Sequence, residues 1–286
     1  WYGDHRDLHL SIRRQRQMCI RDSYSTVLPI YKTGNLKKTK STHTYMDKAI
    51  QKGSVVIQKH SIKIRGKEYC KWIDDNYLMI GKAYFYKGEF DEAIKTFNFI
   101  SEEYKKTNIS YESLLWLARC YIEKNDYSSA ESILIDLDNN RKFPQEYRRD
   151  YEIINADLYL RQKNYPLAKE AILNSLNKYK HRKDKGRLNF IVAQIYQIEE
   201  QYPRATKHYN EVLKTNADYS MVFNTKMNLA LCSDKSSKDS EKMRKQLKHD
   251  CKSYPKNKEE FLPPIETIEV ETKTTKSMEK FFWFSD

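Results

Sequence analysis

The stretch from Asp74 to Thr107 sets the pattern for most of the chain. Its apolar residues recur every three or four positions, as they do on two amphipathic helices. Gly81 and Ala93 are small residues among large apolar ones, which is what two antiparallel helices need where they cross closely. Between them, Gly88 interrupts the apolar period and can adopt the positive φ that ends a helix. The stretch therefore predicts a helical hairpin.

The small residues of this hairpin recur along the chain at a nearly constant spacing. In the expected first helices they are Gly81, Ala118, Ala156, Ala193 and Ala230, which are 37, 38, 37 and 37 residues apart. In the expected second helices they are Ala93, Ala130, Ala168 and Ala205. Coincident periods of this length are typical of tetratricopeptide (TPR) repeats, so we expect an all-α, TPR-type solenoid of helical hairpins.

The solenoid is expected over residues 74–255, with about four full repeats plus flanking helices. Its fifth unit is degenerate, since the second helix, Asp239–Tyr254, has Lys242 where a small residue is expected. A polar last unit is what the end of a stack requires, although decay or truncation of a repeat would give the same pattern. Residues 24–73 are expected to form an N-terminal segment whose one helix, Tyr45–His60, packs under the first full repeat.

Neither end of the chain follows the repeat. Arg13–Ser23 (RRQRQMCIRDS) resembles translated sequencing-adapter sequence, so we interpret residues 1–23 as a disordered, adapter-derived artefact. The alternative is a genuine basic arm. Residues 256–286 lose the apolar period around Pro263-Pro264, and we expect a disordered or non-native tail there.

The net charge is strongly positive, with 52 Lys and Arg against 39 Asp and Glu. Such a balance suits nucleic acid or an anionic membrane surface. However, the basic residues are spread through every unit, and no RNP, helix-turn-helix or zinc motif accompanies them. We therefore interpret the charge as a solvated helix surface and expect no nucleic-acid partner. A basic nucleic-acid-binding repeat protein is the weaker alternative.

The sequence contains no motif typical of catalysis or metal binding. It has no phosphate-binding glycine loop, no G-x-S-x-G and no H-E-x-x-H. The five cysteines form no C-x-x-C pair, and the seven histidines are scattered. No run of 18 apolar residues exists that could span a membrane. We expect no enzyme activity, no cofactor and no metal site.

A TPR solenoid binds partners on the concave wall that its first helices form. In this chain the positions that point into the groove combine apolar side chains with Lys82, Arg119 and Arg187, which are candidate partners for carboxylates. The candidate protein-binding residues are Leu78, Lys82, Phe85, Leu115, Arg119, Ile122, Asp157, Leu160, Arg187, Phe190, Gln194 and Gln197. The alternative for the apolar members is that they pack against neighbouring helices.

Three segments carry a closer resemblance: IQKHS (Ile57–Ser61), GKEYCKWIDD (Gly66–Asp75) and YLMIGKAYFY (Tyr77–Tyr86). The segments VLPIY (Val27–Tyr31), SLLWLARCY (Ser113–Tyr121) and MRKQLK (Met243–Lys248) extend it. Together they resemble the SprE/PorW family of TPR lipoproteins, which belongs to gliding motility and the type IX secretion system. The resemblance covers roughly Val27 to Lys258.

This resemblance implies that the chain is an N-terminal fragment of a lipoprotein on the periplasmic side of the outer membrane in Bacteroidetes-type bacteria. It implies a non-enzymatic scaffold whose protein partners are components of that machinery. The scaffold would link periplasmic motor and ring components to the outer-membrane translocon. The N-terminal lipid anchor expected of the family is missing from this chain, since Cys19 lies in the adapter-like stretch. The alternative is a generic TPR adaptor or a peptide-binding co-chaperone.

Overall fold

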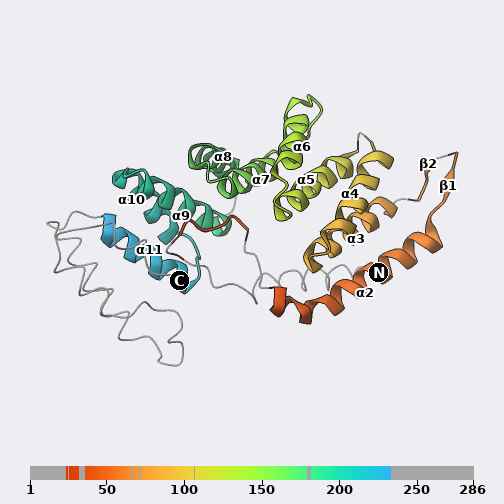
Figure 1. Cartoon of the computed structure of the whole chain (residues 1–286), viewed down its shortest axis with the longest axis horizontal. Helices are drawn as coiled ribbons and strands as arrows, with labels where there is room; N and C mark the ends of the chain where they lie inside the picture. Colours follow the sequence, from red (N-terminus) through yellow and green to blue (C-terminus); the bar gives the residue numbers. More distant parts are fainter. Residues whose placement is uncertain are drawn as a thin grey trace.

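The computed structural model describes residues 24, 26–31, 36–65, 67–70, 72–105, 107–178 and 182–232. They form a curved row of packed helices (Figure 1). The α-helices are α2 (Leu36–His60), α3 (Ile73–Lys87), α4 (Phe90–Glu103), α5 (Asn108–Glu123), α6 (Tyr127–Asn139), α7 (Arg148–Arg161), α8 (Tyr165–Lys178), α9 (Arg182–Ile198), α10 (Tyr202–Leu213) and α11 (Tyr219–Cys232). The short elements are β1 (Lys63–Ile64), β2 (Lys67–Glu68) and the 3-10 helix η1 (Gln145–Tyr147).

Consecutive helices pack in pairs: α3 with α4, α5 with α6, α7 with α8 and α9 with α10. At the ends of the row, α2 packs on α3 and α11 packs on α10. Neighbouring pairs are joined where a second helix meets the next first helix, as α4 does with α5, and α5 also contacts both α3 and α7. The all-α, TPR-type solenoid of helical hairpins is therefore confirmed.

Small residues stand where the two helices of a pair cross. A Cβ atom placed on Gly81 of α3 would lie 2.6 Å from Cε1 of Phe97 in α4, closer than carbon atoms approach. Alanine takes the same position in the next three first helices, and Ala118, Ala156 and Ala193 are fully buried. The predicted close crossings are confirmed, and the first of them has room only for glycine.

The turn inside each hairpin repeats one backbone conformation. Its central residue has positive φ in every pair: 81° at Gly88, 61° at Asn125, 58° at Lys163 and 59° at Glu200. In the first turn, the Gly88 N–H donates to the carbonyl of Phe85, and the next N–H donates to the carbonyl of Tyr84. The other three turns repeat this pair of hydrogen bonds, which satisfies the last carbonyls of a helix. The 37- and 38-residue period of the sequence is therefore also a period of the backbone.

The N-terminal part differs from the prediction in two respects. Helix α2 begins at Leu36, well before the expected start at Tyr45. The prediction missed this first part of the helix because the polar residues between the two positions show no apolar period. A two-stranded hairpin, β1–β2, follows α2 in a stretch for which no strand was predicted. The carboxylate of Glu68 closes this hairpin by accepting from the N–H groups of Ile62 at 2.9 Å and Cys70 at 2.8 Å.

Some predictions concern parts of the chain outside the described residues. These are the artefact at residues 1–23, the second helix of the fifth unit at Asp239–Tyr254, and the tail at residues 256–286. The first helix of the fifth unit is α11, and its Ala230 packs in the interior.

The hydrophobic core runs along the row as successive clusters. The largest joins α7, α8, α9, α10 and α11, and it also takes in Leu28 and Ile30, which precede the first helix. Residues from the start of the chain therefore complete the core of its C-terminal half.

Candidate protein-binding groove

An extended stretch of the chain lies along the first helices of the solenoid. We call residue 24 and residues 26–31 the extended segment; Figure 1 shows it in red beside α9. At one end, the Tyr24 ring packs edge-on against Phe190 of α9, with ring centroids 5.4 Å apart. At the other end, the Tyr31 ring centroid lies 4.0 Å from the guanidinium carbon of Arg119 in α5. The extended segment thus crosses from the fourth repeat to the second.

The side-chain amide of Gln194 in α9 binds the main chain of the extended segment. Its Oε1 accepts from the N–H of Leu28 at 2.9 Å, and its Nε2 donates to the carbonyl of Thr26 at 2.7 Å. The same Nε2 lies 3.3 Å from the carbonyl of Tyr24. An amide supplies both a donor and an acceptor, so Gln194 pairs with the segment as a neighbouring strand would.

Arg187, about two helical turns before Gln194, binds the next part of the main chain. Its Nε donates to the carbonyls of Pro29 at 2.9 Å and Ile30 at 3.0 Å, and its Nη2 donates to Pro29 at 2.7 Å. Every one of these acceptors is a main-chain oxygen. The contacts of Arg187 and Gln194 therefore recognise an extended backbone rather than particular side chains.

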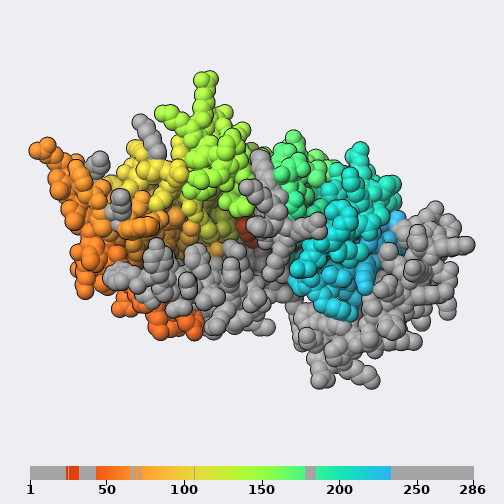
Figure 2. All heavy atoms as spheres, turned by 180° about the vertical axis from the view of Figure 1, so that it is seen from behind, coloured from red at the N-terminus to blue at the C-terminus, as the bar shows by residue number. Residues whose placement is uncertain are grey.

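Leu28 and Ile30 are the side chains of the extended segment that enter the solenoid most deeply, and Val27 packs partly against the same cluster. Leu28 is 1% exposed and Ile30 is 6% exposed, whereas Thr26 and Pro29 face outward. The two buried side chains belong to the same cluster as Ile153 of α7. Burying an aliphatic side chain of this size contributes about 1.5–3 kcal/mol. Figure 2 shows the red atoms of the segment recessed against the green middle of the solenoid.

Aromatic rings surround the guanidinium of Arg119. Its central carbon lies 4.2 Å from the ring centroid of Trp116 and 4.9 Å from that of Phe85, in addition to Tyr31. Rings at these distances attract a cation through their negative faces. Lys82 lies beside the same Trp116 ring, and its Nζ forms an ion pair with Glu112 at 2.6 Å.

A buried acid lies on α7, between the two ends of the extended segment. Asp157 is 2% exposed, and its Oδ2 lies 3.5 Å from Nε of Arg161, which also pairs with Glu123 at 2.6 Å. Burial raises the pKa of Asp157 to about 6, and the nearby Arg161 opposes this rise. Asp157 therefore changes its charge close to neutral pH.

The predicted groove residues fall into three groups. Those that contact the extended segment are Arg119, Arg187, Phe190 and Gln194. Those that pack into the clusters between helices are Leu78, Phe85, Leu115, Ile122 and Leu160. Those that bind a neighbouring side chain are Lys82, Asp157 and Gln197, the last of which accepts from the Tyr209 hydroxyl at 2.8 Å.

Sequence reasoning missed Trp116, Leu28 and Ile30 as groove residues. Trp116 stands two residues before Ala118, at a position that the repeat pattern assigns neither to the helix crossing nor to the groove. Leu28 and Ile30 are two apolar residues separated by Pro29, in a stretch that the repeat does not explain. This short alternating pattern is the signal that could have indicated an extended segment with one buried face.

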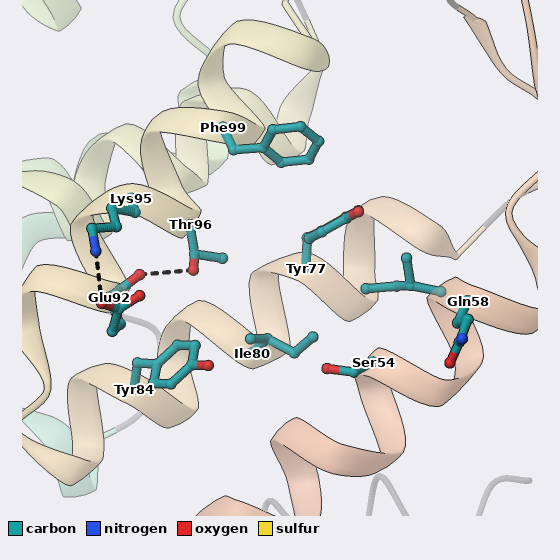
Figure 3. Close-up of a pocket in the computed structure, with 10 residues that line it drawn as sticks. Ser54, Gln58, Tyr77, Ile80, Tyr84, Glu92, Lys95, Thr96 and Phe99 are labelled. Carbon is teal, nitrogen blue, oxygen red and sulfur yellow. Dashed lines mark hydrogen bonds and ion pairs between the residues drawn. The ribbon is translucent and has the colours of Figure 1, made fainter.

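A second hollow lies on another part of the solenoid, between α2, α3 and α4 (Figure 3). It is open, with a volume of about 420 Å³, and Tyr77, Ile80 and Phe99 form much of its wall. Its polar groups bind one another: Lys95 pairs with Glu92 at 2.7 Å, and the Thr96 hydroxyl donates to the Glu92 carbonyl. The inner wall at α9, in contrast, directs Arg187 and Gln194 at a bound main chain.

Metal ligands and thiols are the reactive groups to consider in the described part of the chain. No group of three or more His, Cys, Asp or Glu is placed to hold a metal ion among the described residues. Burial raises the pKa of the Cys120 thiol to about 12 and that of Cys232 to about 11, so both are protonated at neutral pH. Within the same described ranges, every helix is too short or too polar to cross a membrane.

Comparisons with known proteins agree with this architecture. The tetratricopeptide repeat family model matches residues 84–150. BtubC (BKLC) from P. vanneervenii superposes with a TM-score of 0.51 and 11% identity, over 78% of this chain and 94% of that chain. Pseudomonas aeruginosa pilF superposes with a TM-score of 0.50 and 14% identity, over 80% of this chain and 97% of that chain. At such identities the likeness concerns the fold alone.

A further match is a chain of the APC/C hetero-tetramer Cut9-Hcn1, with a TM-score of 0.46 and 15% identity over 69% of this chain. This chain spans 35% of the length of that one. A search of the curated proteins found no match.

The fold and the groove together define a class of protein. Residues 84–150 match the tetratricopeptide repeat family, and the described chain forms a TPR-type solenoid of helical hairpins. Solenoids of this type commonly serve as scaffolds or adaptors in protein–protein interactions.

Proposed function

We propose that this chain is a non-enzymatic scaffold whose inner wall binds extended segments of partner proteins. The observation that carries the proposal is the bound extended segment itself. Arg187 and Gln194 hold its main chain, and two of its side chains are buried in the solenoid. Main-chain hydrogen bonds combined with alternate apolar pockets are a recurrent way of binding a peptide.

We further propose that the scaffold serves the type IX secretion and gliding machinery, on the periplasmic side of the outer membrane. Its partners would be the motor and ring components on one side and the translocon on the other. The support is the resemblance of Ile57–Ser61, Gly66–Asp75 and Tyr77–Tyr86 to the SprE/PorW family.

A chaperone-type carboxylate clamp has less support. TPR domains that grip a C-terminal carboxylate use Lys and Asn at the positions that Leu78 and Lys82 occupy here. In addition, Lys82 already pairs with Glu112. An adaptor that binds the main chain of an extended partner suits the groove better.

A pull-down from the native envelope of a Bacteroidetes-type bacterium tests the proposal. The unmodified chain is expected to recover secretion and gliding components. The Arg187→Glu variant is expected to lose them, because a carboxylate cannot donate to main-chain carbonyls. The matched control is Arg204→Glu, the same charge reversal at an exposed residue of α10. Recovery of only cytosolic or ribosomal proteins would remove the machinery assignment, and equal recovery by both variants would remove the groove as the binding site.

A further inference from the structure

The extended segment occupies the inner wall as a bound peptide would. We propose that it is a displaceable internal occupant, and that a partner's extended segment with two apolar side chains two positions apart takes the same site. This inference rests on the proposed scaffold function and deepens it, because it names the chemistry of the partner and a contact that regulates access.

The first reason is the nature of the polar contacts. Gln194 contacts the N–H of Leu28 and the carbonyl of Thr26, and Arg187 contacts the carbonyls of the two residues after Leu28. All of these groups exist in any extended polypeptide, apart from the N–H that proline lacks. Another chain of suitable shape can therefore replace every one of these hydrogen bonds.

The second reason is the pattern of buried side chains. Leu28 and Ile30 enter the solenoid, and the intervening Pro29 faces solvent and donates no hydrogen bond. The site thus selects a peptide in which an apolar residue is followed by any residue and then by a second apolar residue. Beyond them, the Tyr31 ring stacks on Arg119, which adds a preference for an aromatic side chain at the following position.

The third reason is the tether. The extended segment is joined to α2 through residues 32–35, so it can leave the wall without leaving the molecule. A short tether gives the segment a high effective concentration at its own site. A free peptide of the same sequence therefore meets strong competition in the intact chain, and its apparent affinity falls by the fraction of molecules whose site is open.

The experiment measures binding of a fluorescent peptide with the sequence of residues 24–31 (YSTVLPIY) by anisotropy. The chain carrying Leu28→Asp and Ile30→Asp is expected to bind it at least about tenfold more tightly than the unmodified chain, because its own segment no longer competes. Adding Gln194→Ala to this variant is expected to abolish the gain. The control peptide carries the same two aspartates and is expected not to bind.

Equal affinity of the unmodified chain and the variant would overturn the proposal. A gain that survives Gln194→Ala would overturn it too, because the peptide would then be bound elsewhere. Loss of the helical circular-dichroism signal in the variant would also count against it, since a displaceable occupant must leave a folded solenoid behind.

A second measurement needs no substitution in the segment. Hydrogen exchange of residues 26–31 in the unmodified chain is expected to accelerate when millimolar peptide is added, while exchange in α9 stays unchanged. Unchanged exchange in residues 26–31 would overturn the proposal. These tests use purified components, so they are separate from the envelope pull-down: a negative pull-down with a positive peptide test removes only the machinery assignment.

Discussion

Replacing Gln194 by alanine tests the groove at its best-defined contact. The substitution removes the acceptor for the Leu28 N–H at 2.9 Å and the donor for the Thr26 carbonyl at 2.7 Å. When the extended segment detaches, water takes the place of both hydrogen bonds, so each is worth a net 0.5–1.5 kcal/mol, or about 1–3 kcal/mol for the two. Opening of the segment should therefore become about 5- to 150-fold more frequent.

Hydrogen exchange at the Leu28 amide reads out this opening directly, and its rate should rise by the same factor. The control is Gln197→Ala, on the same helix. Gln197 accepts from the hydroxyl of Tyr209, whose side chain is fully buried, so its loss should lower global stability without releasing the extended segment. The reasoning is refuted if Gln194→Ala leaves the exchange of Leu28 unchanged, or if Gln197→Ala accelerates it equally.

Four further substitutions test the fold and its charges by urea unfolding. Gly81→Ala should destabilise the chain by about 1–2 kcal/mol, because the clash of the new Cβ, 2.6 Å from Phe97, outweighs a gain in helix propensity of up to about 1 kcal/mol. In a Phe97→Leu background this loss of stability should disappear. A loss of equal size there would contradict the close crossing of the two helices. Glu200→Gly should stabilise the chain by roughly 0.5–1 kcal/mol, and Gly88→Ala should destabilise it by a similar amount, since both positions have positive φ. Changes of the opposite sign in the free energy of unfolding would refute the turn assignment. Asp157→Asn should remove a pH dependence of the free energy of unfolding. The pKa of Asp157 in the folded chain, about 6, exceeds the ordinary 3.8. The carboxyl therefore makes its full contribution to stability below pH 3.8, and this contribution is lost as the pH rises through 6. Between these limits the unmodified chain should lose up to about 3 kcal/mol relative to the variant, and parallel pH profiles would contradict the burial of this carboxyl.

Most of the hairpin architecture could be predicted from the sequence, because it depends on local requirements that repeat. Each crossing needs a small residue, so Gly81 and the alanines at its position indicate every first helix. Each turn needs one residue with positive φ, and this residue breaks the apolar period at a fixed phase. Such requirements leave a periodic trace in the sequence.

The groove could be predicted only in part, because it depends on how distant parts of the chain meet. Gln194 and Gln197 lie three residues apart on one helix, yet the first binds the extended segment and the second binds Tyr209. Nothing in the repeat distinguishes them, since the difference arises from the segment that lies against α9. Leu28 and Gln194 are 166 residues apart, and a single contact over that distance has no period to reveal it.

The central claim is that the inner wall of the solenoid holds the extended segment. Nuclear Overhauser effects between the ring protons of Tyr24 and Phe190, and between Tyr31 and the side chain of Arg119, measure this most directly. We expect both sets of Overhauser effects, because the ring centroids of Tyr24 and Phe190 lie 5.4 Å apart and the guanidinium carbon of Arg119 lies 4.0 Å from the ring centroid of Tyr31. A folded, helical chain that shows neither would contradict it.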